Sequence, residues 1–400
     1  MPSSSIALVV FAAELDREHA AYGAVQNFVD VYESDVDRIA VVGPEHIDID
    51  RSVVDPVPVQ RPESSVPPAA VTGYVGYQLR IAAALWRDRD RLDAAFFHIG
   101  GTMLLLPLLA CKLAGVRTLL FVTGTVTEGV YARRGTGPLV RGLASIVDLV
   151  ERVTCTLADD VILLSSGMDH PALEWPTSPT VRAVNVNYVD CEAFAKRTPI
   201  EERPVDVAFV GRFAAVKGID DILGALPLLV ESNPDIRIAL IGDGELSAEV
   251  AAFVDRHDLS ENVTCTGWVD HDELPAHLDD ARTLLLPSRS EGVPKAVLEA
   301  MACGTVPVAA AVGGIPDLVD DGSNGFLLGD TDPASIERTV TAVLERDDLD
   351  AVSDAARDYI ERNYAYSTIR ERYRRILLEG ETERATAESG RDAESGRESV

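Results

Sequence analysis

Short apolar runs alternate with stretches of helical periodicity along most of this chain. In the first half, apolar runs of strand length lie at 6–11, 38–42, 94–98, 118–123, 160–164 and, more weakly, 181–186. Between them, apolar residues recur at helical spacing over stretches that include 76–86, 104–114 and 139–157. Repeated strand–helix units of this kind predict parallel sheets with helices on their faces.

The alternation pauses once and then starts again. Residues 191–204 are polar and contain prolines. Beyond them, strands are expected at 205–210, 237–241, 263–266, 283–286 and 306–310, and helices at 219–230, 246–256 and 295–302. Two such blocks predict an α/β chain with two doubly wound parallel-sheet domains, in which ligands bind at the carboxyl ends of the strands.

The same pattern predicts how the chain is divided. We expect a first domain over 1–190, a linker over 191–204, a second domain over 205–348, helices over 349–380 and a disordered acidic tail over 381–400. The tail is built from charged and small residues, so it cannot bury a core.

The charge balance argues against one class of partner. The 400 residues include 36 Lys and Arg against 65 Asp and Glu, a formal net charge of −29. A protein that neutralises nucleic-acid phosphates needs a basic face, which this balance opposes. Only four basic residues are lysines: Lys112, Lys196, Lys217 and Lys295. This favours a halophilic host, in which salt screens self-repulsion; an acidic mesophilic protein from a GC-rich genome is the alternative.

The cysteines and the N-terminus narrow the setting. Five widely spaced cysteines with no C-x-x-C pair favour reduced thiols and no zinc site. No basic region precedes the first apolar run, and the apolar stretch 103–116 is too short to span a bilayer. We therefore expect a cytoplasmic protein, or one peripheral at the inner face of the membrane, with no transmembrane segment and no zinc site.

A first candidate site follows the first strand of the second block. In F-V-G-R-F-A-A-V-K-G, the strand ends at Val210 and Gly211 allows a tight turn. Arg212 and Lys217 then stand in the loop before a helix. Two cations beside a helix N-terminus predict a phosphate site. Two solvated loop charges are the structural alternative.

A second motif, S-E-G-V-P-K-A-V-L-E, follows a later strand of the same block. Gly292 permits close approach of a ligand, Pro294 suits the start of a helix, and Lys295 adds a cation to its first turn. Glu299 lies a little over one turn further on. Its carboxylate can accept hydrogen bonds from vicinal hydroxyls, as an acidic residue does on ribose in dinucleotide sites. Glu291, in the loop, can do the same for a hexose.

Three further loops at strand ends carry glycines. They contain Gly242 and Gly244 in G-D-G-E, Gly267 in G-W-V, and Gly313 with Gly314 in G-G-I-P-D. Taken alone, each fits either a binding loop or a plain turn between strand and helix.

Taken together, these motifs resemble the donor half of the GT-B glycosyltransferases called family 4. The resemblance rests on G-R-F-x-x-x-K-G, on the E-x7-E pair within S-E-G-x-P-K-x-x-L-E-A-M-A-C-G, and on G-G-I-P-D; it is strong over 205–328. It implies two Rossmann-like domains facing each other across a cleft. It also implies that Arg212 and Lys217 bind the diphosphate of a nucleotide sugar, Glu291 the donor sugar and Glu299 the ribose.

The resemblance further implies retention of anomeric configuration, no catalytic metal, an acceptor site in the first domain and final helices that cross back to that domain. The residues expected to act in catalysis are Glu291, Arg212, Lys217 and His98. The expected donor site comprises Gly211, Arg212, Lys217, Gly242, Gly244, Gly267, Glu291, Gly292, Pro294, Lys295, Glu299, Gly313 and Gly314.

The acceptor side is less clearly marked. His98 stands at a strand end before Gly100 and Gly101, which would point it into the cleft, although a lone histidine is more often a core or surface residue. Many members of the family carry a histidine after the next strand, where this chain has none. Thr123 and Gly124 are expected to line the acceptor side there.

A basic island stands out in this acidic chain. Arg133, Arg134 and Arg141 lie within 131–142, which contains no acidic residue and leads into an amphipathic helix. It predicts a docking patch for lipid phosphate, in a bilayer or in a polyprenyl-phosphate-linked acceptor. Solvated arginines on a loop and helix are the alternative.

The sequence thus predicts a retaining, metal-independent hexosyltransferase that moves a sugar from a nucleotide-diphosphate sugar to a glycan or lipid-linked acceptor. Assembly of a surface polysaccharide or glycoprotein glycan is the expected setting. A non-catalytic nucleotide-sugar-binding subunit is one alternative. A sugar-nucleotide epimerase is another, but the E-x7-E pair and the Arg212/Lys217 pair are not expected of it.

Overall fold

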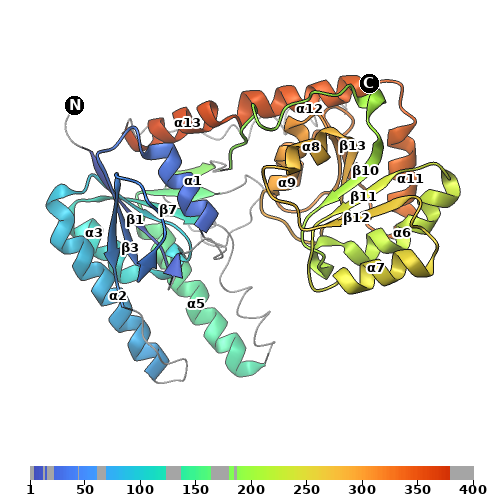
Figure 1. Cartoon of the computed structure of the whole chain (residues 1–400). Helices are drawn as coiled ribbons and strands as arrows, with labels where there is room; N and C mark the ends of the chain where they lie inside the picture. The colour runs from blue at the N-terminus through green and yellow to red at the C-terminus, as the bar shows by residue number, and fades with distance from the viewer. Residues whose placement is uncertain are drawn as a thin grey trace, which may run out of the picture. The chain divides into compact units, whose positions relative to one another are not determined.

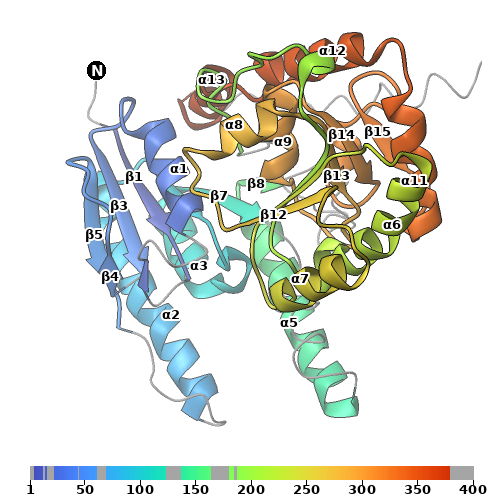
Figure 2. The same ribbon diagram turned by 45° about the vertical axis from the view of Figure 1, so that its right-hand side comes forward.

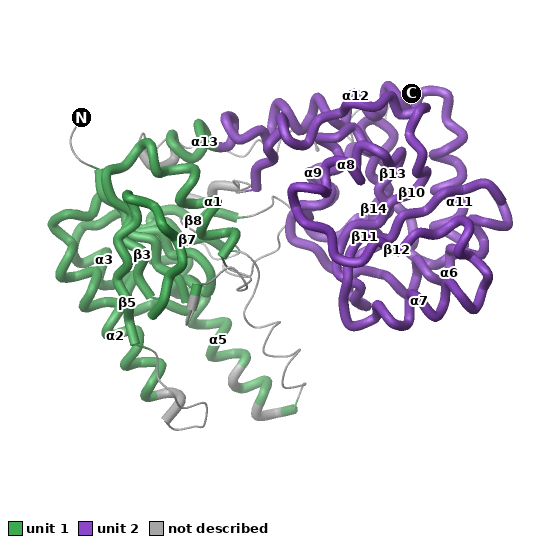
Figure 3. The backbone as a smooth tube through the Cα atoms, in the orientation of Figure 1, with its two compact units in different colours: residues 1–186, 370–400 green, residues 187–369 purple. Residues whose placement is uncertain are grey.

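A computed structural model of the chain describes residues 4–11, 14–15, 22–43, 45–60, 69–122, 137–163, 180–183 and 187–378. The chain forms two compact units (Figure 3). Unit 1 comprises residues 1–186 and 370–400, and unit 2 comprises residues 187–369.

Unit 1 is built on a seven-stranded parallel sheet with the strand order β5-β3-β1-β6-β7-β8-β9. Its strands are β1 (Ser5–Val9), β3 (Arg38–Gly43), β5 (Val54–Pro58), β6 (Ala94–Phe97), β7 (Arg117–Val122), β8 (Asp160–Leu163) and β9 (Thr180–Ala183). A separate parallel pair joins β2 (Glu14–Leu15) to β4 (His46–Ile47). Because β1, β3, β6, β7 and β8 are buried on both faces, they are apolar almost throughout.

Helices cover both faces of this sheet (Figures 1 and 2). Helix α2 (Ala69–Asp88) packs against α3 (Leu105–Ala114), which packs against α5 (Pro138–Leu157). Their inner sides join a core with alternate strand residues such as Phe97 and Leu120. The neighbouring Phe96 and Phe121 point to the other face, where they meet aromatic residues of α1 (Tyr22–Tyr32) and α13 (Tyr366–Leu378). The two-residue period of a strand thus divides the core between two helical layers.

Unit 2 is built on a six-stranded parallel sheet with the order β12-β11-β10-β13-β14-β15. Its strands are β10 (Val205–Val210), β11 (Ile238–Ile241), β12 (Val263–Gly267), β13 (Ala281–Leu286), β14 (Val306–Ala310) and β15 (Phe326–Leu328). Its helices are α6 (Ile219–Ser232), α7 (Ser247–Arg256), α8 (Leu274–Asp279), α9 (Lys295–Ala302), α10 (Ile315–Leu318), α11 (Pro333–Leu344) and α12 (Leu349–Asn363). The strand order reverses between the neighbouring strands β10 and β13, so the carboxyl ends of these two strands form a topological switch point.

The segment before β10 is fastened to unit 2 by Arg203. Its guanidinium is fully buried and donates to the carbonyl oxygens of Ala281 at 2.7 Å and Cys303 at 2.8 Å. It also bonds the carbonyl of Thr198 at 3.1 Å and lies 3.4 Å from an Asp279 oxygen. One side chain therefore ties residues 198–203 to β13 and to the end of α9.

Helix α13 belongs to both units, because the boundary between them falls at residue 370 within the helix. In its unit 1 portion, Tyr373 packs edge-on against Tyr32 of α1, with ring centroids 5.8 Å apart. Arg370 forms an ion pair of 3.0 Å with Asp35.

The predicted α/β class, with two doubly wound parallel sheets, is confirmed. Two strands of the large sheets, β5 and β15, were not predicted, and neither were β2 and β4 of the separate pair. Strand β5 carries Pro56 and Pro58, which obscure a strand pattern but fit its place at the sheet edge. Strand β15 has three residues, too few for a periodic signal. The predicted tail over 381–400 lies outside the described residues.

Candidate functional site

The loops at the carboxyl edge of the unit 2 sheet pack closely around glycines. Gly211 and Gly242 follow the ends of β10 and β11, and Gly267 is the last residue of the neighbouring β12. The Gly242 N–H donates to the Gly267 carbonyl at 2.9 Å. A Cβ on Gly242, at φ +141°, would lie 2.0 Å from the Gly211 carbonyl oxygen. No side chain fits there. A Cβ on Gly244 would similarly meet the backbone of Phe213, at 2.5 Å.

Two motifs that are distant in sequence meet at this edge. Lys217 ends the 3-10 turn η5 (Ala215–Lys217) after β10, and Glu291 lies in the loop after β13. The Lys217 Nζ lies 2.7 and 3.0 Å from the two Glu291 carboxylate oxygens. The loops also share a backbone bond, from the Arg289 N–H to the Val216 carbonyl at 2.9 Å.

The loop that carries Gly313 and Gly314 packs against the loop that carries Glu291 and Gly292. The Gly314 N–H donates to the Gly292 carbonyl at 2.7 Å. A Cβ on Gly313, at φ +57°, would lie 1.8 Å from the Glu291 carbonyl oxygen. Gly313 is therefore required by the contact between two loops, and the loop that carries Glu291 is held on both sides.

Helix α9 presents Glu299 at the same edge. Helix α9 begins at Lys295, with Pro294 as the capping residue before it. The Glu299 side chain is 5% exposed, and one carboxylate oxygen lies 2.8 Å from the His271 Nε2 and 3.7 Å from the Lys295 Nζ. A buried carboxylate is costly without such partners.

His271 is the member of this cluster that the sequence did not reveal. It lies in the loop after β12, beside three acidic residues and in no recognisable motif. Its ring centroid lies 5.3 Å from that of Phe194, and its Nε2 faces the Glu299 carboxylate. Only the fold brings this loop to α9.

Two of the helices that begin at this edge, α6 and α9, differ in the charge of their first turns. The first turn of α6 carries Asp220 and Asp221, whose negative charge opposes the binding of a further anion at that N-terminus. The first turn of α9 carries no acidic residue and includes Lys295. The predicted phosphate site beside Arg212 and Lys217 is therefore better served by the N-terminus of α9 than by that of α6.

Cations gather at this edge of a strongly acidic unit. Residues 187–369 contain 35 Asp and Glu but only 14 Lys and Arg, and three of the latter are Arg212, Lys217 and Lys295. Arg212 is exposed and forms no ion pair within the described part of the chain. The edge combines cations and a helix N-terminus, which suit an anion, with carboxylates that can accept bonds from hydroxyls.

Over the described ranges, the structure contains no group of three or more His, Cys, Asp or Glu placed to hold a metal ion. Within the same ranges, no helix is both long and apolar enough to cross a membrane. The buried thiols of Cys111, Cys155 and Cys303 are unpaired, and burial raises the pKa of each to about 12.

In unit 1, His98 follows β6 and lies among aromatic rings. It is 3% exposed, its ring centroid is 4.7 Å from that of Phe121, and its Nδ1 is buried with no hydrogen-bond partner among the described residues. Burial lowers the pKa of His98 to about 4, so the ring is neutral at pH 7. Gly100 and Gly101 pack closely on Phe11 and Phe97, respectively.

The remaining residues predicted for unit 1 have mixed outcomes. Thr123, Gly124, Arg133 and Arg134 lie outside the described residues. Arg141 lies in the first turn of α5, exposed and without an ion pair among the residues that the structure describes.

Comparison with known proteins gives one family. The profile described as "Glycosyl transferases group 1" matches residues 190–365. The chain is 30% identical over 298 residues to the 2-deoxystreptamine glucosyltransferase of Streptomyces kanamyceticus, covering 69% of this chain and 76% of that protein. It is 32% identical over 141 residues to an uncharacterized glycosyltransferase of Methanocaldococcus jannaschii, but spans only 38% of that relative's length.

The fold has close counterparts among solved structures. Anabaena HepE in complex with UDP matches with a TM-score of 0.69, at 16% identity, over 94% of this chain and 99% of that one. At this identity the likeness concerns the fold.

Proposed function

This chain belongs to the group 1 glycosyltransferase family, and from that premise we propose that it moves a sugar from a nucleoside-diphosphate sugar to a glycan or lipid-linked acceptor. The proposal includes retention of anomeric configuration, membership of family 4, transfer of a hexose and a role in surface glycan assembly. It also includes a halophilic host and a cytoplasmic location, or one peripheral at the inner face of the membrane.

One observation carries the proposal: the ion pair between Lys217 and Glu291. In a nucleotide sugar, the anomeric carbon and the terminal phosphate share one bridging oxygen. A cation for the phosphate and a carboxylate for the sugar hydroxyls must then be neighbours. The Lys217 Nζ lies 2.7 Å from the Glu291 Oε1 at the switch point of the sheet. Doubly wound folds bind nucleotides at this point.

The other residues take roles that follow from their positions. Arg212 and Lys295 add positive charge to that of the α9 N-terminus. These two cations and the helix N-terminus together hold the diphosphate. Glu299 accepts hydrogen bonds from the ribose hydroxyls, and His271 holds its carboxylate in place at 2.8 Å. Gly292, with no side chain, leaves the backbone beside Glu291 open to the sugar.

The reaction breaks the bond between the anomeric carbon and the phosphate oxygen. Negative charge grows on the leaving diphosphate, and the cations together with the α9 N-terminus neutralise it without requiring a metal. The acceptor hydroxyl oxygen forms the new bond to the anomeric carbon, and its proton passes to the leaving diphosphate, whose oxygen has gained the bonding electron pair. We propose that His98, Gly100, Gly101, Thr123 and Gly124 serve the acceptor side.

The test is a donor screen by thermal shift and nucleotide release, across UDP-, GDP- and ADP-sugars. Wild type is compared with Lys217→Ala, and Lys112→Ala removes a surface lysine of unit 1 as the matched control. We expect one donor to stabilise wild type and the control but not Lys217→Ala, with slow release of nucleoside diphosphate. Folded protein that no donor stabilises would refute the site. Binding without release on any acceptor would favour a non-catalytic subunit.

A further inference from the structure

Exposed apolar side chains gather on one helical layer of unit 1. Nine large apolar side chains are exposed in the described part of the chain, and six of them lie on α2, α3 and α5. These six are Val75, Leu79, Trp86, Leu113, Ile146 and Leu149, with exposed fractions from 42% to 79%. We call the outer side of these three helices the α2–α3–α5 face.

The layered fold places these side chains on the same side of the sheet. The inner sides of α2, α3 and α5 all contribute to one core beneath them. Helix α3 lies between the other two, and it carries only one charged residue, Lys112. Its Leu105, Leu106 and Leu109 are only half-buried. The exposed residues of α2 and α5 are therefore joined by a further apolar strip on α3.

The charges on this face have the opposite sign to that of the chain. Arg80, Arg87 and Arg141 are exposed and form no ion pair with any described residue. The acidic residues of the three helices are engaged elsewhere: Asp88 pairs with Arg38, Asp148 with Arg152, and buried Glu151 bonds Thr102. Residues 64–87 and 94–127 contain no Asp or Glu at all.

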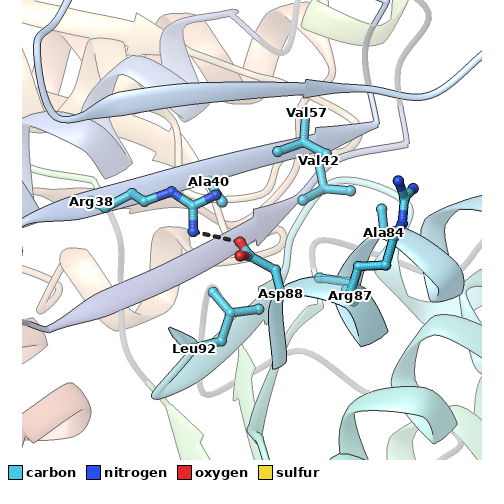
Figure 4. A pocket seen from close by; sticks show the side chains of 9 residues that line it. Arg38, Ala40, Val42, Val57, Ala84, Arg87, Asp88 and Leu92 are labelled. Carbon is cyan, nitrogen blue, oxygen red and sulfur yellow. Dashed lines mark hydrogen bonds and ion pairs between the residues drawn. The ribbon is translucent and has the colours of Figure 1, made fainter. Parts of the chain in front are cut away.

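A pocket lined by both apolar and charged residues opens beside α2 on the same side of the sheet. It has a volume of about 210 Å³ and lies between α2 and the strands β3 and β5, of which β5 is at the sheet edge. Ala40, Val42 and Val57 form part of its lining, and the Arg38–Asp88 ion pair lies along it (Figure 4). Arg87 extends away from that pair, so its charge remains available to a partner.

We propose that the α2–α3–α5 face docks on an anionic lipid surface. Apolar side chains enter the boundary between headgroups and acyl chains, a tryptophan suits that boundary, and arginines reach anionic headgroups. A second copy fits less well, because a symmetric contact through one face would bring the arginines of both copies together. The proposal goes beyond sugar transfer and does not depend on it.

The first experiment is flotation of the full chain with vesicles of phosphatidylglycerol or of phosphatidylcholine, over a series of salt concentrations. We expect binding to the anionic vesicles that weakens as salt rises. In Arg80→Gln/Arg87→Gln/Arg141→Gln, binding should fall by about fivefold for each arginine removed. Arg256→Gln removes an exposed arginine of unit 2 that forms no ion pair with any described residue, and it should bind like wild type.

A second variant tests the apolar contribution. Leu79→Ser/Leu113→Ser/Ile146→Ser changes exposed side chains, so its circular dichroism and thermal unfolding should stay close to wild type. Binding to anionic vesicles should fall by at least tenfold. In a chain with Trp175→Phe and Trp268→Phe, nitroxide-labelled lipid should quench Trp86, which is then the sole tryptophan.

Three results would overturn the proposal. One is no vesicle binding by folded wild type. Another is binding that both triple variants retain in full. The third is self-association through this face, abolished by the serine variant while vesicle binding is absent. Donor binding is measured in parallel, so a failure of lipid docking is distinguishable from a failure of the proposed sugar transfer.

Discussion

The two units share one architecture and differ in what they expose. Each is a parallel sheet with helices on both faces. Residues 1–186 carry 15 Lys and Arg against 22 Asp and Glu, whereas residues 187–369 carry 14 against 35. In unit 2, cations and glycines concentrate at the carboxyl edge of the sheet. In unit 1, exposed apolar side chains, and arginines that pair with no described acidic residue, spread over a helical layer. The sheet supplies a scaffold, and the loops and outer surfaces supply the chemistry.

One buried polar side chain in each unit illustrates two ways of burying a polar group. In unit 2, Arg203 is buried with several acceptors around it, whereas in unit 1 the His98 ring is buried and its Nδ1 has no hydrogen-bond partner among the described residues. The first arrangement stabilises by satisfying its hydrogen bonds. The second depends on the histidine staying neutral. Each can be tested with a tryptophan of its own unit, Trp268 in unit 2 and Trp86 in unit 1.

The largest expected effect is on the stability of unit 2. Arg203→Met removes the donor that serves the carbonyls of Thr198, Ala281 and Cys303, and it should cost about 3–5 kcal/mol. Urea unfolding followed by Trp268 fluorescence, with Trp86 and Trp175 replaced by Phe, measures it. The neighbouring exposed Arg197→Met should change stability by less than about 0.5 kcal/mol. Equal losses in the two variants would contradict the role given to Arg203.

The next effect belongs to unit 1 and depends on pH. His98 has a pKa of about 4 in the folded state, below its ordinary value of 6.5, so the unfolded state binds more protons between these values. Stability should fall by about 3 kcal/mol as pH drops from 7 to 4. His98→Phe should lose this part of the acid sensitivity. Unfolding followed by Trp86 fluorescence at several pH values measures it, and an unchanged pH profile in the variant would count against a neutral buried His98.

The smallest expected effect is on the donor KM, and it tests the contact between His271 and Glu299. His271→Ala leaves the Glu299 carboxylate without its nearest partner, so the donor KM should rise about fivefold, equivalent to about 1 kcal/mol. His271→Gln, which can still donate to Glu299, should restore most of it. Because we propose that His271 acts through Glu299 on the ribose, the alanine variant should discriminate less between ribonucleotide and 2′-deoxyribonucleotide sugars. Equal losses on both donors would point to a merely structural role.

Much of the fold was predictable because its signals are local. Apolar runs such as 205–210 and 306–310 mark strands buried on both faces, and each was found as a strand. Strand β5 was not predicted, because its prolines contradict the pattern of an interior strand. Prolines are tolerated in β5 because it lies at the edge of the sheet. Helix α1 was not singled out, although its Phe28 and Tyr32 occupy the core beneath it.

Most members of the candidate site could be predicted from the sequence, but not their contacts, and His271 could not be predicted at all. Glycines, cations and the two glutamates stand at strand ends, and topology alone brings such ends to one edge. His271 carried no signal, because its meaning lies in a contact with a helix 28 residues away in sequence. The acidic first turn of α6 is visible in the sequence. Its consequence for phosphate binding becomes clear only by comparison with the first turn of α9, which has no acidic residue and begins with Lys295.

The sequence by itself determined the alternation of strands and helices, the acidic balance and the residues that crowd the strand ends. The tertiary structure decided that Lys217 meets Glu291, that His271 meets Glu299, and that six apolar side chains share one outer face. The physical reason is range. Periodicity records which residues of a helix or strand share a side, whereas the handedness and order of the crossovers decide what covers that side.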